Sequence, residues 1–195
     1  LIPNLQVRSK TSGKVFLSAA RVEISLPWDT LTGGAPIITR IELDAPALDL
    51  PGLREWQATR PPTPFELPTL TKGLMVRNGL VRDAGLMVSK LALDLPHLKS
   101  GEPANVKTSG IFRQGETAIA FDVAITVATA GLDSEFTIAG SGELLQKPKP
   151  LPFKLKAAGH YRSDDEAVSV EARSLRFGGT SPLPNLGGAL TLRSA

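Results

Sequence analysis

Apolar and polar side chains alternate along many stretches of this chain, and this two-residue period limits its fold more than any other feature. In the clearest stretch, Ile119, Phe121, Val123, Ile125 and Val127 are separated by small or polar residues. Such alternation is typical of a β-strand that buries one face. The same period occurs in about nine or ten stretches. Among them are residues 22–26, 37–43, 91–95, 153–157 and 168–172. We therefore predict an all-β fold.

One strand ending occurs twice. Ala47-Leu-Asp-Leu-Pro-Gly-Leu53 returns as Ala92-Leu-Asp-Leu-Pro-His-Leu98. Proline cannot donate a ladder hydrogen bond, so we expect each strand to stop at Pro51 or Pro96. The repeat indicates a chain built from recurring β units.

Turn residues suggest that strands adjacent in sequence pair antiparallel. Arg77-Asn-Gly-Leu80 is typical of either an Asn-Gly turn or a strand bulge, whereas Arg113-Gln-Gly-Glu116 and Ser163-Asp-Asp-Glu166 predict tight polar turns. Helical signals are confined to Trp28-Asp-Thr-Leu31 and the stretch from Leu53 to Ala58, each beside a proline. We expect one or two short helical turns at strand ends.

Prolines mark the connections between β units. Residues 60–68 contain four prolines, which favours an extended link and a crossing between two units. Residues 147–152 form a second proline-rich link, and residues 178–188 predict a turn before a last strand. We expect one β-rich domain over residues 1–195, with a subdivision near residues 60–68 as the alternative.

The apolar faces of these strands need a cover, because each buried aliphatic side chain contributes about 1.5–3 kcal/mol. A second sheet would make a sandwich, and the curl of the sheet itself would make a partial barrel. An incompletely closed, taco-like groove would instead hold an apolar ligand. The prediction is a curved antiparallel sheet of one of these three kinds. The predicted lining of the apolar surface is Val22, Ile24, Ile41, Leu43, Val76, Leu93, Ile119, Phe121, Val123 and Ile125.

Residues suited to catalysis or metal binding are scarce. The two histidines, His97 and His160, have no ligand-type neighbour, and Gly140-Ser-Gly142 lacks the spacing of a nucleophile elbow. Residues 164–166 lack the further oxygens of a calcium loop, and the chain has no cysteine. We predict a non-enzymatic protein with no catalytic residue, metal or cofactor. A glycan hydrolase, the alternative, would need two carboxyl groups about 5–10 Å apart in a cleft.

The charge distribution does not favour nucleic acid as a partner. The net charge is +3 with a pI of about 9.3, and acidic residues alternate with basic ones. One basic cluster comprises Lys147, Lys149, Lys154 and Lys156. It suits anionic lipid headgroups or an acidic partner, although the solvated face of a strand would have the same composition.

Two segments resemble AsmA-like proteins, a family related to repeating β-groove envelope proteins. Ile38-Thr-Arg-Ile-Glu-Leu-Asp-Ala-Pro-Ala-Leu-Asp-Leu50 is similar to the strand, proline, strand signature of that family. Leu74-Met-Val-Arg-Asn-Gly-Leu-Val-Arg-Asp83 resembles the glycine-centred strand pair that follows it. The resemblance covers roughly residues 15–100, and the second half of the chain fits only as generic antiparallel strands.

The resemblance implies a periplasmic β module of a Gram-negative bacterium that binds or conducts phospholipid along an apolar groove in outer-membrane biogenesis or maintenance. It also implies an inner-membrane anchor. No apolar run of this chain approaches the roughly 18 residues of a membrane span, so we expect such an anchor to lie outside these residues. The alternative function is a structural or assembly module of the envelope, with a closed apolar core and edge strands that pair with other envelope proteins.

Overall fold

The computed structural model describes residues 1–10, 12–27, 38–60, 67–131, 133–162, 167–177 and 188–193. For residues 167–168, 172–173 and 188–193 it describes the backbone alone. Several predicted features therefore lie outside the described residues. These are the helical turn at 28–31, most of the proline-rich link at 60–68, the turn at 163–166 and most of the turn at 178–188.

Twelve strands form one sheet, which confirms the prediction of an all-β curved sheet and exceeds the nine or ten expected strands. The strands are β1 (Ile2–Arg8), β2 (Val15–Ser25), β3 (Arg40–Asp44), β4 (Ala47–Asp49), β5 (Leu74–Asp83), β6 (Leu86–Leu95), β7 (Ala104–Gln114), β8 (Thr117–Val127), β9 (Asp133–Leu144), β10 (Leu151–Arg162), β11 (Ala167–Phe177) and β12 (Gly188–Arg193). Neighbours follow the order β1-β2-β3-β5-β6-β7-β8-β9-β10-β11-β12, and β4 pairs with β2 and β5 beside β3.

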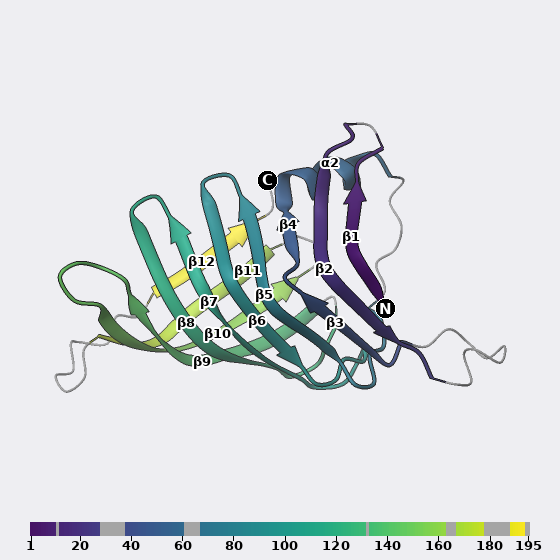
Figure 1. The fold of residues 1–195 in the computed structure, drawn as a ribbon. Helices are drawn as coiled ribbons and strands as arrows, with labels where there is room; N and C mark the ends of the chain where they lie inside the picture. Colours follow the sequence, from purple (N-terminus) through teal and green to yellow (C-terminus); the bar gives the residue numbers. More distant parts are fainter. Residues whose placement is uncertain are drawn as a thin grey trace.

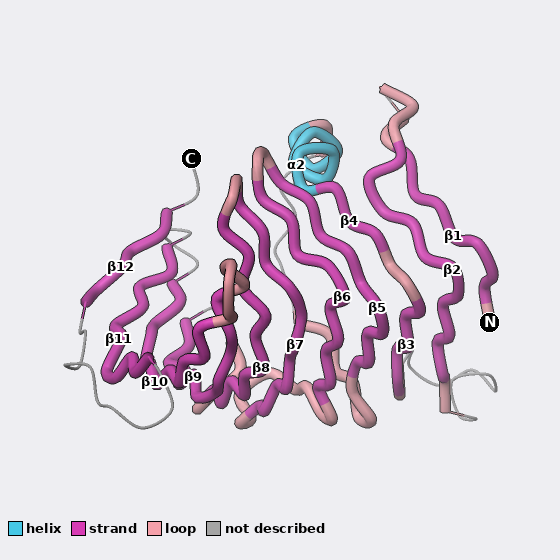
Figure 2. Tube along the Cα trace, turned by 60° about the vertical axis from the view of Figure 1, so that its left-hand side comes forward, coloured by secondary structure: helices cyan, strands magenta, loops and turns pink. Residues whose placement is uncertain are grey.

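The sheet curls into an open trough. In Figure 1 the strands β10–β12 pass behind β5–β8, so the last strands of the sheet form a wall opposite its middle strands. Figure 2 shows the same strands as one unbroken curved layer. Strands β1 and β12 each pair on one side only in the described part of the chain, so the described sheet does not close into a barrel.

Antiparallel pairing of all sequential neighbours was expected, and this prediction is wrong on both sides of β4. Strands β3 and β4 do not pair with each other, and β5 runs parallel to both, which makes the sheet mixed. After β4 the chain forms helix α2 (Leu50–Ala58), and β5 then begins at the other end of the strands, away from α2. A crossover of this length permits parallel pairing, which a two-residue hairpin cannot. Strands from both sides of the proline-rich link therefore share one sheet.

The two copies of the repeated strand ending differ in structure. The second copy is strand up to Leu95, directly before Pro96, as expected. In the first copy β4 ends at Asp49 and α2 starts at Leu50, before Pro51 and three residues earlier than the predicted helix. Asp49 caps this helix, since its Oδ2 accepts a hydrogen bond of 2.9 Å from the Gly52 amide.

Glycine at position 52 accounts for part of this difference. It is buried against Phe16, and a Cβ there would lie 2.9 Å from the Phe16 Cβ. Trp56 of α2 packs on Phe16 with ring centroids 5.2 Å apart, and the Arg60 guanidinium lies 3.8 Å from the Trp56 ring centroid. The second copy has His97 at the position of Gly52, which could not pack as closely. This helix covers one end of β2, β4 and β5 (Figure 1).

Left-handed backbone bends the first half of the sheet. Asn4, Ala45, Asn78 and Lys90 have positive φ angles, and they lie in β1, between β3 and β4, in β5 and in β6. The register of β5 with β6 shifts beside Asn78 and beside Lys90, so both strands carry a bulge. Bulges bend a strand and increase its twist. Of the two alternatives predicted for Arg77-Asn-Gly-Leu80, a turn or a strand bulge, the structure has the bulge. The hairpin turn lies at Ala84 and Gly85.

Candidate functional site

One face of the sheet carries a row of apolar side chains that crosses almost every strand. Directly paired residues of neighbouring strands point to the same side of a sheet. The central row of pairs, from β2 to β11, is Val22, Leu43, Val76, Leu93, Thr108, Val123, Gly140, Leu155 and Leu175. Only Thr108 and Gly140 interrupt the large aliphatic side chains of this row.

Parallel rows lie on both sides of the central row. Ile24 pairs with Ile41, and Ile125 pairs with Ile138. Phe121 pairs with Gly110 and Gly142, and Ile119 with Phe112. The structure therefore places the ten predicted lining residues on one side of the sheet, which we call the apolar face. That this face contacts lipid stays a prediction.

The apolar face is only partly covered. Val22 and Val76 are buried, with 4% and 8% exposure, whereas Ile24 is 42% exposed. The other predicted lining residues are partly buried, and none of the large side chains in the described residues is fully buried. The core residues of a sandwich or closed barrel would exclude water almost completely. Of the three predicted covers, the described part of the chain fits the open trough.

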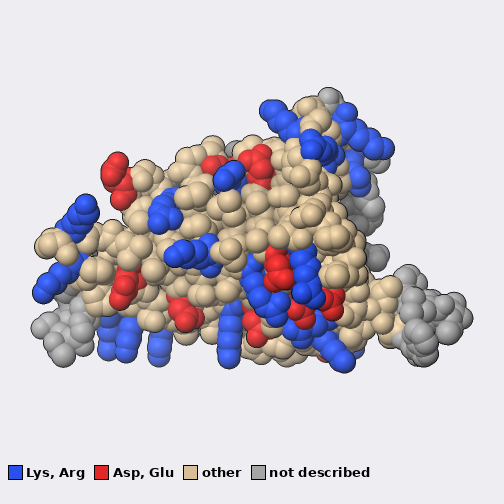
Figure 3. Space-filling view, in the orientation of Figure 1, with Lys and Arg blue, Asp and Glu red and all other residues tan. Residues whose placement is uncertain are grey.

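The apolar face lies on the inside of the curve. The ion pairs between Arg77 and Glu42, at 3.0 Å, and between Arg77 and Asp44, at 3.4 Å, join residues on the opposite side of β3 and β5. Figure 3 shows a dense group of acidic and basic side chains over β3 and β5 on the side toward the viewer. The strands β10–β12 lie on the far side of this wall in the same view (Figure 1). We call the charged side the outer face.

The outer-face ion pairs stabilise the charged forms of their members. Hydrogen bonds from Arg77, with a further contribution from Arg40, lower the pKa of Glu42. At the end of β5, both Arg54 guanidinium nitrogens donate to Asp83, at 2.9 and 2.8 Å. This fork and the Ala84 amide lower the pKa of Asp83. The pair also holds α2 against the β5–β6 hairpin.

Glycines and phenylalanines face each other on the inner wall of the second half of the sheet. The rings of Phe121, Phe153 and Phe136 lie close to the glycines that they pair with. A Cβ at Gly142 would lie 2.5 Å from the Phe153 ring, and one at Gly159 would lie 2.4 Å from the Phe136 ring. Rings that cover glycines let neighbouring strands bend toward the inner side without exposing backbone.

A small cluster closes one end of the apolar face. Leu95, Ala104 and Ala130 are 8%, 4% and 6% exposed. Partly buried residues from strands and loops pack against them; these are Leu67, Leu74, Leu93, Leu98, Val106 and Val127. Leu70 is bridged to Leu98 and is 3% exposed. This end of the apolar face is therefore closed by packed side chains from strands and loops.

The four predicted lysines are all exposed. Lys147 and Lys149 lie in the loop between β9 and β10, while Lys154 and Lys156 lie on the outer face of β10. The register places Arg176 of β11 directly opposite Lys154. The sequence did not reveal Arg176 as a neighbour, because period-two patterns do not specify how two strands are aligned.

Each of the two histidines contacts one acidic side chain. His97 Nε2 lies 2.9 Å from Glu102 Oε2, and Lys99 also contacts Glu102. These two partners, Lys99 first, lower the pKa of Glu102. His160 contacts Asp133. Among the described residues no three His, Asp or Glu side chains are grouped to hold a metal ion.

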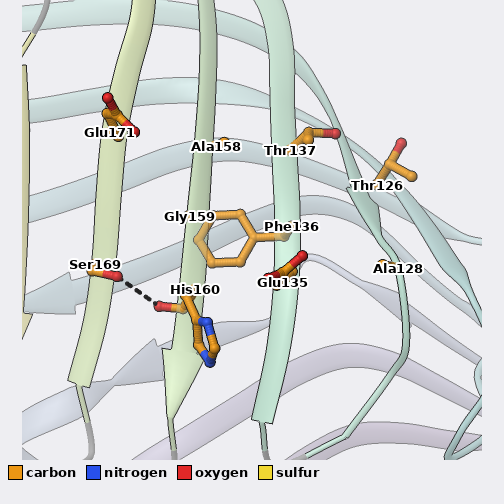
Figure 4. A pocket seen from close by; sticks show the side chains of 10 residues that line it. All are labelled: Thr126, Ala128, Glu135, Phe136, Thr137, Ala158, Gly159, His160, Ser169 and Glu171. Atoms are coloured by element: carbon orange, nitrogen blue, oxygen red, sulfur yellow. Dashed lines mark hydrogen bonds between the residues drawn. The ribbon is translucent and has the colours of Figure 1, made fainter.

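A hollow of about 380 Å³ on the outer face of β8–β11 contains polar groups (Figure 4). Glu135, Glu171, His160 and Ser169 line it. The Ser169 hydroxyl donates to the His160 carbonyl oxygen at 3.4 Å and not to the imidazole ring. This geometry is not that of a nucleophile activated by a histidine base. Gly140-Ser-Gly142 lies within β9, and the next described element is strand β10, not a helix.

No described helix has the length and apolarity needed to span a bilayer. Comparison of the chain with family models, with curated proteins and with solved structures finds no match.

Proposed function

We propose that this protein binds the acyl chains of phospholipid, or a similar apolar ligand, on the apolar face of its curved sheet. The observation that carries the proposal is the central apolar row, which runs from β2 to β11 and whose members, apart from Val22 and Val76, stay partly exposed. Contiguous exposed apolar surface is rare on monomeric proteins and marks a binding site.

The dimensions suit an acyl chain. From Ile119 to Val127 the inner side of β8 is about 27 Å long, at a rise of about 3.4 Å per residue. One acyl chain occupies about half of the roughly 30 Å hydrocarbon core of a bilayer. At about 0.8 kcal/mol per buried methylene, a 16-carbon chain would gain on the order of 10 kcal/mol before entropy costs.

The composition of the face also suits a flexible ligand. Aromatic residues make up 5% of the chain, and the phenylalanines Phe121, Phe136 and Phe153 lie over glycines of the neighbouring strands. The surface left for a ligand is therefore formed largely by Val, Leu and Ile. Branched aliphatic side chains offer no stacking platform for a planar ligand, whereas they contact a disordered hydrocarbon chain along its length.

The cellular part of the proposal rests on the resemblance of residues 38–50 and 74–83 to AsmA-like proteins. In the structure these segments contribute to β3, β4 and β5, the parallel crossover region. We propose that the protein is a periplasmic, non-enzymatic module of a Gram-negative cell envelope, tethered to the inner membrane, that binds or conducts phospholipid in outer-membrane biogenesis or maintenance.

The alternative function, an assembly module with a closed core, has less support. A closed core requires a layer over the apolar face, and none of the described strands supplies one. The outer edges of β1 and β12, with which no described strand pairs, would still allow other envelope proteins to add strands. Strand addition at an edge and lipid binding on the inner face are compatible.

Native mass spectrometry of the protein purified from bacterial envelopes tests the proposal. We expect adducts with the masses of phospholipids, released as phospholipid by solvent extraction. A matched pair of variants on one strand separates the two faces: Val123→Asp puts a carboxylate on the apolar face, and Ala124→Asp puts it on the outer face. We expect the adducts to disappear with Val123→Asp and to remain with Ala124→Asp. Folded wild-type protein without any apolar adduct would contradict the proposal.

A further inference from the structure

The outer face of β10 and β11 carries a strip of positive charge. Lys154 and Lys156 alternate along β10, and Arg176 of β11 is paired with Lys154. Lys147 and Lys149 are in the loop that leads into β10. All these side chains are exposed, and we call them the basic strip. In Figure 3 several Lys and Arg side chains project from the lower edge of the molecule, below β9.

The strip differs from the basic groups of this protein that a carboxylate neutralises. Arg21, Arg40, Arg54, Arg77 and Lys99 each form an ion pair with a carboxylate. No described acidic side chain forms an ion pair with a member of the strip. The residues paired with its strand positions are small: Ser141 and Ala139 on β9, and Ser174 on β11.

A hollow lies among these cations. Its volume is about 340 Å³, and it is lined by Lys154, Lys156 and Arg176 together with Ala139, Gly140, Leu155 and Ser174. The small residues beside the three cations leave room for an anion that is larger than a water molecule. The Ser174 hydroxyl adds a hydrogen-bond donor. Phosphate esters suit such a site, because Arg and Lys both donate charge-assisted hydrogen bonds to phosphate oxygens.

We propose that the basic strip docks the protein on an anionic phospholipid bilayer, with headgroup phosphates in the hollow. Charge complementarity carries this choice, since unpaired cations several residues apart match a surface of many phosphates better than a single soluble anion. The strip is on the outer face, opposite the apolar face, so this inference is independent of the proposed acyl-chain binding. A docked protein would keep the apolar face free.

Vesicle flotation of the whole chain tests the inference. The probes are vesicles of pure phosphatidylcholine and vesicles of phosphatidylcholine and phosphatidylglycerol in equal parts. We expect partitioning into the anionic vesicles alone, weakened by salt. Each cation near an anionic surface raises partitioning about fivefold, so the variant Lys154→Gln, Lys156→Gln, Arg176→Gln is expected to partition about a hundredfold less.

A control variant removes the same charge elsewhere. Lys72, Lys90 and Lys107 are exposed and outside the strip, and their joint replacement by Gln is expected to leave partitioning within about fivefold of the wild type. Equal losses in both variants, or equal partitioning into both vesicle types, would overturn the inference. Binding of inorganic phosphate at the strip without vesicle binding would overturn it as well. Binding of a fluorescent fatty acid, measured on the same variants, reports separately on the apolar face.

Discussion

The pair of substitutions Val123→Asp and Val22→Asp distinguishes an open apolar face from a covered core. Both valines belong to the central apolar row, but Val22 is 4% exposed whereas Val123 is only partly buried. Val22→Asp lowers the free energy of unfolding by about 1.5–3 kcal/mol, because the apolar valine side chain is no longer buried. The free energy of unfolding falls by several kcal/mol more, because the buried carboxylate loses its hydration and gains no partner. A domain has about 5–15 kcal/mol of stability in total, so we expect Val22→Asp to unfold most of the protein.

An aspartate at position 123 can keep part of its hydration. We expect a loss of about 2 kcal/mol, near the lower bound of the apolar term for one valine. In urea this loss lowers the unfolding midpoint by about 1 M at a slope of about 2 kcal/mol/M. Ala124→Asp on the outer face is the control, and we expect its stability to stay within about 0.5 kcal/mol of the wild type.

Urea titrations followed by circular dichroism give the unfolding midpoints of the three variants. Titration with a fluorescent fatty acid measures how well each folded variant binds an apolar ligand. Val123→Asp should be folded and should have lost the ligand, while Ala124→Asp should be folded and should bind it. If Val123→Asp unfolds as completely as Val22→Asp, the apolar face is covered and the reasoning fails.

Two further substitutions test how the trough is shaped and held. A Cβ at Gly140 would lie 2.3 Å from the Asp122 carbonyl oxygen and 2.7 Å from the Val123 Cα. Gly140→Ala should therefore lose about 3 kcal/mol in urea unfolding. Gly131→Ala, whose nearest contact would be 3.7 Å, should lose less than about 0.5 kcal/mol. Equal effects would mean that β8 and β9 are not as close as described. The second substitution, Asp83→Asn, removes a carboxyl whose pKa Arg54 lowers. A lowered pKa in the folded state stabilises the fold above about pH 4 and loses this effect as the pH falls through the folded pKa. The melting temperature should therefore fall less between neutral and strongly acidic pH in Asp83→Asn than in the wild type; identical falls would argue against the ion pair.

Period-two alternation was sufficient to predict the type of fold and the shared face. The pattern from Ile119 to Val127 is strand β8, and the pairing of strands places the predicted lining residues on one side. Side-chain alternation depends only on local backbone geometry, which is why it can be read from the sequence.

Features that depend on long-range pairing could not be predicted. The parallel pairing of β5 with β3 depends on the path of the chain through α2. The two Ala-Leu-Asp-Leu-Pro segments have the same local preferences, and the one that becomes a helix start is the one whose following glycine, Gly52, packs on Phe16. Arg176 lies beside Lys154 because of the register in which β11 pairs with β10, and this register could not be predicted from the sequence.

The central claim is that the inner, apolar face is open and receives an acyl chain. Because the protein has no cysteine, single cysteines can carry an environment-sensitive fluorophore at position 123, by Val123→Cys, or on the outer face of the same strand and outside the basic strip, by Ala124→Cys. The labelled proteins are titrated with a short-chain phospholipid that has brominated acyl chains, below its critical micelle concentration. Saturable quenching at position 123 with weaker quenching at position 124 is the predicted result. No quenching at position 123, or equal quenching at both positions, would contradict the claim.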